Sequence, residues 1–237
     1  MAKIKLAKDI TYRINGETTP GYLAVPDSPS PAPSVIVIQE VWGLNDDIRR
    51  ICRMFAEAGY AALSPDLYNG RSTTDLEEAM KIRATMEMAR AVKDIDVAIK
   101  YLQALPEAKN KPVGMIGFCM GGGLTLETAI RGGKISAGAC FYGGPQGDLG
   151  RFSTIKVPIL CAFGAEDHLI PLSRVEEIRQ ALQKNKIDHE VHVYQGAGHS
   201  FFNEVKPEWY KPDVAKVAWG HVLAFYERTL KKTAAKK

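Results

Sequence analysis

The chain has 237 residues, 46% of them hydrophobic and 24% charged, which is typical of a folded globular protein and excludes a disordered one. The formal net charge of +4 equals the charge of four lysines in the last seven residues, a segment at about 231–237 that we expect to be a frayed tail. Without a basic stripe interleaved with aromatic residues, the sequence argues against nucleic-acid binding.

The amino-terminal sequence, Met-Ala-Lys-Ile-Lys, lacks the apolar stretch of a secretory signal, and no apolar run reaches the length of a membrane span. The cysteines are far apart and form no C-x-x-C pair, so their spacing indicates neither a zinc site nor a redox dithiol. We therefore expect a cytoplasmic protein with reduced thiols, no metal, no cofactor and no membrane partner.

The first elements in chain order begin with a hairpin over residues 10–25, predicted from the tight-turn pair Asn15-Gly16. A buried strand follows at 35–38. Asn45 then caps a helix that ends at Gly59 and carries an apolar face of Ile48, Ile51, Cys52 and Phe55. Residues 60–63 form the next strand, whereas residues 71–85 are polar and show no clear period.

The rest of the chain alternates between strand and helix patterns. Helices are predicted at 88–105, 120–131, 173–184 and 213–230, and strands at 113–118, 136–141, 159–163 and 191–194. This alternation is typical of an α/β fold, with a mostly parallel sheet covered by helices on both faces. We expect one domain over residues 1–237, because no second core is visible.

The sharpest local motif is Gly-Phe-Cys-Met-Gly at 117–121, between a buried strand and a helix start. It matches the nucleophile elbow of hydrolases with Cys119 in the serine position. Glycines two residues before and after the nucleophile avoid collisions in such a tight turn. The following helix start favours a thiolate, and the backbone N–H of Met120 is a natural oxyanion donor. The alternative is a structural cysteine, which is our reading of Cys52, Cys140 and Cys161.

A cysteine nucleophile works best with a base and a group that orients the base. Asp167 and His199 each follow a predicted strand, in the chain order nucleophile, acid, histidine that this kind of enzyme uses. Glu166 is a conceivable substitute for Asp167. Glu40 ends the apolar run at 35–38, so we expect a partly desolvated carboxylate with a raised pKa, or else a structural salt bridge.

These motifs resemble the dienelactone hydrolase family over roughly residues 10–228. The resemblance is carried by the segments 39–43, 59–62, 65–68, 117–122, 164–168 and 198–201. It implies an α/β-hydrolase fold and a triad of Cys119, His199 and Asp167. It also implies that Glu40 takes part in forming the thiolate and that the Val41 N–H is the second oxyanion donor. The family further suggests a monomer or a weak homodimer.

The pocket residues are less sharply defined. Tyr142 and Ser200 match family positions near the site, and Trp42 and Phe202 are apolar candidates that equally fit core packing. Family members hold a substrate carboxylate with arginines, but Asn203 occupies one such position here. Arg71 and Arg83 are the nearby candidates for the other, although surface roles fit them as well. Two charge-assisted contacts to an acidic substrate are therefore in question.

The sequence thus predicts a hydrolase that cleaves a carboxylic ester or lactone through a cysteine acyl-enzyme, with a small molecule as its partner. The alternative is a redox-sensing or ligand-binding thiol protein on a hydrolase-like scaffold without turnover. Peroxide sensitivity without ester cleavage would favour that alternative. Cys119 with its acid and histidine in order favours the hydrolase.

Overall fold

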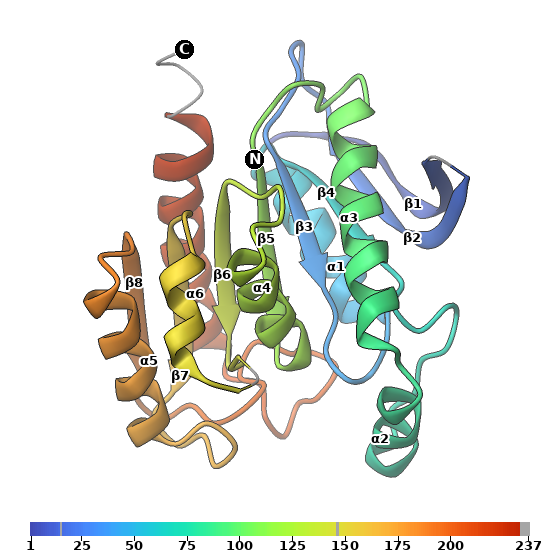
Figure 1. The fold of residues 1–237 in the computed structure, drawn as a ribbon. Coiled ribbons are helices and arrows are strands. Elements are labelled where there is room, and N and C mark those ends of the chain that lie inside the picture. The colour runs from blue at the N-terminus through green and yellow to red at the C-terminus, as the bar shows by residue number, and fades with distance from the viewer. Residues whose placement is uncertain (15, 146, 233–237) are drawn as a thin grey trace. The chain divides into compact units, whose positions relative to one another are not determined.

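The computed structural model describes residues 1–14, 16–145 and 147–232 (Figure 1). The chain divides into two compact units, Met1–Met115 and Ile116–Lys237, and each unit contains strands and helices. The expectation that these two units form a single domain stays a prediction.

The amino-terminal unit contains β1 (Ile4–Ile14), β2 (Glu17–Pro26), β4 (Ala61–Pro65) and β3 (Ser34–Ile38), neighbours in that order. The first three pair antiparallel, and β3 runs parallel to β4. The β1–β2 hairpin confirms the prediction but starts earlier, at Ile4, because the alternating residues before position 10 continue the strand. Asn15 of the predicted turn lies outside the described residues.

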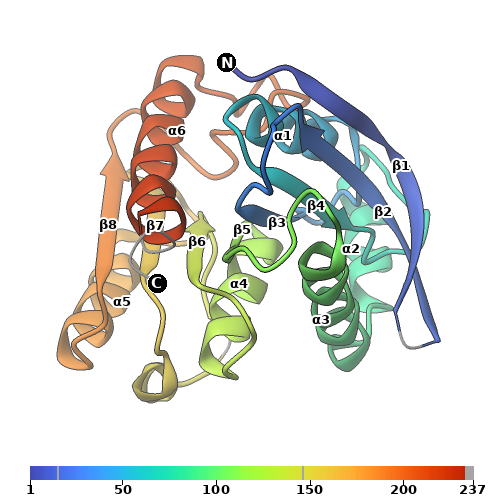
Figure 2. The same ribbon diagram turned by 90° about the horizontal axis from the view of Figure 1, so that it is seen from above.

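The helices α1 (Asp46–Glu57) and α3 (Met88–Ala104) cover opposite faces of this sheet (Figure 2). The predicted cap of α1 is confirmed, since the side-chain oxygen of Asn45 accepts a hydrogen bond of 3.2 Å from the Ile48 N–H. The predicted apolar face is also confirmed, and its residues are at most 1% exposed: Ile48, Ile51, Cys52 and Phe55.

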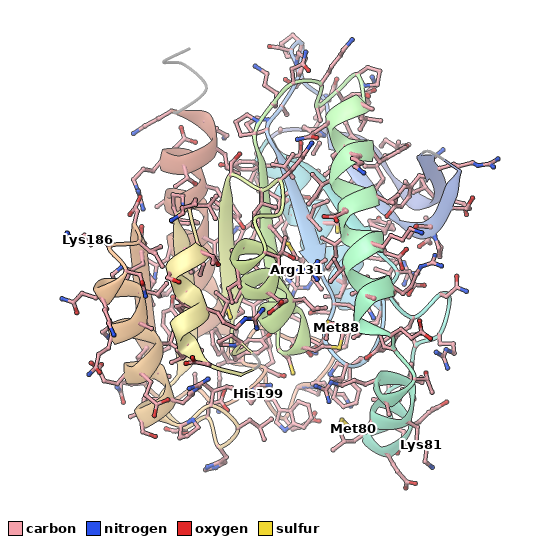
Figure 3. All side chains as sticks on the ribbon, viewed as in Figure 1. Met80, Lys81, Met88, Arg131, Lys186 and His199 are labelled. Atoms are coloured by element: carbon pink, nitrogen blue, oxygen red, sulfur yellow. The ribbon has the colours of Figure 1, made fainter. Side chains whose placement is uncertain are left out.

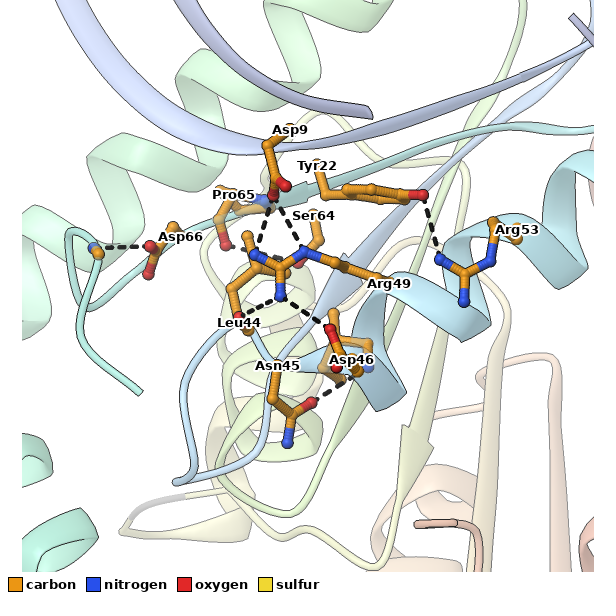
Figure 4. A network of polar contacts seen from close by, with 12 residues as sticks. Asp9, Tyr22, Leu44, Asn45, Asp46, Arg49, Arg53, Ser64, Pro65 and Asp66 are labelled. Carbon is orange, nitrogen blue, oxygen red and sulfur yellow. Dashed lines mark hydrogen bonds and ion pairs between the residues drawn. The ribbon is translucent and has the colours of Figure 1, made fainter. Parts of the chain in front are cut away.

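Arg49 ties three segments of this unit together (Figure 4). Its guanidinium contacts the Asp9 carboxylate of β1 at 2.9 Å and donates to the Leu44 carbonyl at 3.1 Å and to Asp46 at 3.4 Å. One planar group with several donors thus links strand, loop and helix start, and fixes the loop between β3 and α1.

The helix α2 (Leu76–Ala84) lies in the segment 71–85, where the sequence showed no clear pattern. Asp75 caps it by accepting from the Glu78 N–H at 2.8 Å. Only Ala79 and Ile82 are buried, whereas Met80 on this helix is exposed (Figure 3). This helix was not predicted because its two buried residues lie within one helical turn and form no continuous apolar stripe in the sequence.

The carboxyl-terminal unit begins within β5 (Val113–Phe118), which leads into α4 (Met120–Ile130). In this unit β6 (Ala137–Phe141) pairs parallel with β7 (Ile159–Gly164), and β7 pairs parallel with β8 (His189–Tyr194). The helix α6 (Pro212–Tyr226) covers one face, and α4 and α5 (Leu172–Lys184) cover the other (Figure 2). A short 3₁₀ turn, Leu149–Thr154, connects β6 and β7.

The end of the chain differs from the prediction. A π-helical turn, Glu227–Lys231, continues α6, and Lys231 forms an ion pair of 3.2 Å with Glu227. Lys231, which the sequence assigned to a frayed tail, is therefore helical. Residues 233–237 lie outside the described residues. Across the part of the chain that the structure describes, no helix is both long and apolar enough to cross a membrane.

The close approach at Gly164 generates a stability prediction. A Cβ there would lie 2.3 Å from the Ala197 carbonyl oxygen. Gly164→Ala should lower the free energy of unfolding by about 3 kcal/mol, because backbone must move to admit the methyl group. Gly220→Ala in α6, which meets no atom within 4 Å, should instead raise it by about 1 kcal/mol. Urea unfolding of both variants measures the difference, and equal effects would contradict the steric argument.

Candidate active site

Cys119 occupies the sharp turn between β5 and α4. Its backbone has a φ of +53°, which side-chain-bearing residues rarely adopt, and its N–H donates to the Phe141 carbonyl at 3.0 Å. A Cβ on Gly117 would lie 1.9 Å from the carbonyl oxygen of Gly121. Glycine at 117 is therefore required by backbone contact, as the elbow interpretation predicted.

The thiol of Cys119 stands at the start of α4, for which Cys119 is the N-cap residue. Cys119 is half-buried, whereas the other three cysteines are fully buried. The N–H groups at a helix start carry partial positive charge, which favours a thiolate and a developing oxyanion. Met120 is the first helical residue, so its N–H belongs to this group.

The loops after β7 and β8 are held together by main-chain contacts. The N–H of Ala165 donates to the Tyr194 carbonyl at 2.9 Å, and the N–H of Glu166 donates to the Ala197 carbonyl at 2.9 Å. These bonds extend the parallel β7–β8 pairing beyond Gly164 and bring the acid loop against the histidine loop. Parallel pairing thus brings Asp167 and His199 together, although they lie 32 positions apart in the chain.

The Asp167 carboxylate is the centre of this arrangement. Its Oδ2 accepts a hydrogen bond of 2.8 Å from Nδ1 of His199. Its Oδ1 accepts from the N–H groups of Leu169 at 2.8 Å and Ile170 at 3.0 Å. The Asp167 side chain is fully buried, so these donors replace water around the charge. Of the two acidic candidates, Asp167 contacts the histidine, whereas Glu166 is exposed.

The imidazole of His199 carries an unusually stable positive charge. Burial lowers its pKa, but the hydrogen bond to Asp167 and the neighbouring Cys119 sulfur raise it, and the net pKa is about 10. The Nε2 atom is buried and has no hydrogen-bond partner of ordinary geometry among the described residues. His199 can therefore deliver a proton to a group that enters the site, and neutral His199 can accept one. Figure 3 labels the position of His199.

Aromatic rings support the histidine. The Tyr142 ring, whose residue has a φ of +36°, packs edge-on against His199 with centroids 5.2 Å apart. Phe201 contacts Tyr142 at the same centroid distance. Phe202 is 2% exposed and stacks on Phe118 at 5.5 Å, which makes it part of the aromatic core.

The residues after His199 form a tight turn. Ser200 is buried and has a φ of +58°. Asn203 is 1% exposed, and its side-chain oxygen accepts from the Val205 N–H at 3.1 Å. The N–H of Asn203 donates to the Ser200 carbonyl at 3.0 Å. The side-chain oxygen of Asn203 therefore helps to stabilise this turn.

In the amino-terminal unit, Glu40, Val41 and Trp42 follow β3 directly, and each is at most 9% exposed. The Trp42 carbonyl accepts from the Thr73 N–H at 3.1 Å, which ties this turn to the segment before α2. The predicted burial of Glu40 at the end of the strand is confirmed. Its role in forming the thiolate stays a prediction.

The arginine candidates belong to the segment around α2. Arg71 is exposed, and its guanidinium donates to the Tyr68 carbonyl at 3.4 Å and to the Thr85 hydroxyl at 3.0 Å. Arg83 lies in the last turn of α2. Asp66 forms the turn before this segment, since its carboxylate accepts from the N–H groups of Tyr68 and Gly70.

The sequence analysis missed Gly143 and Gly144, which follow Tyr142. A Cβ on Gly143 would lie 2.5 Å from the Cys119 carbonyl oxygen, and a Cβ on Gly123 would lie 2.7 Å from the Gly144 carbonyl oxygen. The glycine pair thus lets the chain after β6 pass directly against the elbow. Two glycines directly after a strand end were the signal for this close approach.

A strand–turn–helix cysteine, with an acid and a histidine on later strand ends, defines the class of α/β-hydrolases. Three comparisons agree with this class. The family model "Dienelactone hydrolase family" matches residues 19–230. A Synechocystis protein named "Putative carboxymethylenebutenolidase" is 33% identical, over 89% of this chain and 92% of that protein. The "Carboxymethylenebutenolidase" of Pseudomonas putida is 31% identical, over 83% of this chain and 86% of its own.

Among solved structures, "Putative Dienelactone Hydrolase from Klebsiella pneumoniae" superposes with a TM-score of 0.85 at 28% identity, covering 93% of this chain and 98% of that one. The predicted α/β-hydrolase fold, with a mostly parallel sheet and helices on both faces, is confirmed. The chain belongs to the dienelactone hydrolase family, and it is a hydrolase.

The raised pKa of His199 generates a prediction for pH dependence. In ¹³C-labelled protein, the His199 ring signal should titrate near pH 10, and Asp167→Asn should lower that midpoint, because a neutral amide holds an imidazolium less strongly. Since the folded pKa is raised, the stability from this pair is complete below the unfolded pKa of about 6.5 and is lost as pH rises toward 10. The exposed neighbour change Glu166→Gln should leave the midpoint in place. A wild-type midpoint near 6.5 would contradict the assignment.

Proposed function

We propose that this enzyme hydrolyses a carboxylic ester or lactone through an acyl-thioester on Cys119. The observation that carries the proposal is the hydrogen bond between Asp167 and His199, with the pKa of His199 raised in part by the Cys119 sulfur. This combination is what a cysteine nucleophile needs from a base and an orienting acid.

The reaction begins with attack of the Cys119 thiolate on the substrate carbonyl carbon. The carbonyl oxygen takes the negative charge and is stabilised by the Met120 N–H and, by family resemblance, the Val41 N–H. When the C–O bond breaks, the His199 imidazolium gives its proton to the leaving oxygen. Neutral His199 then takes a proton from water, hydroxide attacks the thioester, and the acid and the thiolate are released. In a lactone the leaving oxygen stays tethered to the acyl group.

Glu40 has a proposed role in forming the thiolate, by analogy with the family. The support from this chain is a carboxylate that is 3% exposed at the end of a strand, where charge is costly and a proton is readily exchanged. Glu40→Gln should therefore lower the rate of Cys119 alkylation by iodoacetamide at pH 7. Glu77→Gln, the same change at a carboxylate of α2 that is 79% exposed, is the control. Identical alkylation rates would make Glu40 structural.

The substrate's charge is the finer question. Two relatives carry the name carboxymethylenebutenolidase, and that name describes those proteins and does not by itself assign a substrate to this chain. In this chain an amide, Asn203, shapes the turn after His199, and the Arg71 guanidinium donates to its own segment. We propose that neutral esters and lactones are accepted without a need for a substrate carboxylate.

Replacement of the nucleophile tests the mechanism. Cys119→Ala should lower kcat for p-nitrophenyl acetate by at least about 1,000-fold, because no other group forms the acyl-enzyme. Cys52→Ala, a buried thiol on α1, should retain activity once its folding is checked by circular dichroism. Mass spectrometry of enzyme quenched during turnover should show the acyl mass on Cys119. Full activity in Cys119→Ala would overturn the proposal, and peroxide-sensitive Cys119 without turnover would favour the redox-thiol alternative.

A substrate comparison tests the charge argument. We expect kcat/KM for a neutral lactone to equal or exceed that for cis-dienelactone, because the Asn203 position supplies no cation to a substrate carboxylate. Asn203→Arg should shift the ratio toward the anionic substrate. A strong preference of the wild type for cis-dienelactone would contradict the prediction. It would mean that a cation elsewhere in the chain binds the substrate carboxylate.

A further inference from the structure

The segment directly after the catalytic acid is apolar and is held by that acid. Residues 169–172 read Leu-Ile-Pro-Leu, and the N–H groups of Leu169 and Ile170 both donate to Oδ1 of Asp167. Leu169 is 69% exposed and Leu172 is 50% exposed. Large apolar side chains gathered at the surface beside a catalytic residue are a feature of ligand-binding surfaces.

Ile170 faces a glycine that borders the nucleophile's segment. A Cβ built on Gly144 would lie 3.6 Å from Cδ1 of Ile170, and within 4 Å it would meet no other atom of the described residues outside its chain neighbours. Among the described residues, the side-chain direction of Gly144 therefore has room for a methyl group and faces one aliphatic side chain. Both walls, a glycine backbone and an isoleucine, lack charge.

This position lies next to backbone that packs against the turn carrying the reacting thiol. Gly143 lies against the Cys119 carbonyl, so that a Cβ there would be 2.5 Å from its oxygen. The Gly144 carbonyl lies against Gly123, whose N–H donates to the Cys119 carbonyl at 3.2 Å. The open space at Gly144 thus adjoins the turn that carries the nucleophile.

The acyl part of a substrate fits this space better than the alcohol part. In the proposed reaction the leaving oxygen must reach His199 for its proton, whereas the acyl group stays bonded to Cys119. Gly144 follows the glycine that lies against the Cys119 carbonyl, so a wall at Gly144 is better placed for the group that remains on Cys119. Each methylene removed from water against an aliphatic wall favours binding.

We propose that Ile170 is a specificity-determining residue that holds the aliphatic acyl chain of the substrate over Gly144. This inference rests on the proposed function. If the inference holds, the enzyme prefers medium-length aliphatic acyl groups over acetyl. The residue that selects the acyl group then lies in the turn that Asp167 anchors.

A chain-length series with a constant leaving group tests this. Ile170→Ala and Ile170→Ser should lower the ratio of kcat/KM for p-nitrophenyl hexanoate to that for p-nitrophenyl acetate by about 10-fold. Gly144→Ala fits at van der Waals distance and should lower the same ratio by filling the space. Val217→Ala, at an apolar side chain of α6 that is 52% exposed, is the matched control and should leave the ratio unchanged.

The outcomes separate the inference from the proposed function. An unchanged ratio in the Ile170 variants, or an equal loss on both esters, overturns the inference, since equal loss means that Ile170 only positions Asp167. A second readout needs no turnover: the Cys119 thiolate displaces methanesulfinate from hexyl or methyl methanethiosulfonate and forms a mixed disulfide. The hexyl-to-methyl labelling ratio should fall in Ile170→Ala. If the wild type cleaves no ester, this labelling ratio still decides the inference.

Discussion

The hydrogen bond between the Asp167 carboxylate and the His199 imidazole is the interaction on which the site depends. A fully buried carboxylate is stable only when donors replace its water, and here an imidazole and two backbone N–H groups do so. Those bonds fix three things together: the orientation of His199, its positive charge, and the course of the chain at residues 169–170. The acid is thus both an electrostatic partner and the anchor of its own loop.

Close backbone packing makes that arrangement possible. The acid loop and the histidine loop meet because Gly164 has no side chain to hold Ala197 away, and the elbow closes because Gly117 can lie on Gly121. The glycines of this unit therefore determine distances that side chains alone could not set. The strained backbone of Cys119 and Tyr142 is found in the same region, where such conformations are held by surrounding contacts.

Membership in the dienelactone hydrolase family and the local chemistry point to the same class of reaction. The family resemblance led us to expect an arginine at position 203, and this chain has there an amide whose oxygen accepts from its own loop. Apolar residues after Asp167 offer a different basis for selecting a substrate. In the proposed mechanism, chemistry and selectivity are separate features: the triad would perform the cleavage, and Ile170 in the turn at 169–172 would select the acyl group.

The sequence by itself determined the elements with strong periodicity and the three triad candidates. The apolar face of α1, the strand positions and the order Cys119, Asp167, His199 follow from local patterns, because burial and strand-end placement leave a mark on neighbouring residues. It missed α2, whose short buried face has no stripe, and it misplaced Lys231, since a helix can continue through polar residues. Only the tertiary structure showed that Asp167 rather than Glu166 contacts His199, that Gly143 and Gly144 pass against the elbow, and that Phe202 lies in the core. These three features depend on which segments of the chain meet in space. The residues that meet are far apart in the sequence, so no local sequence pattern records their contact.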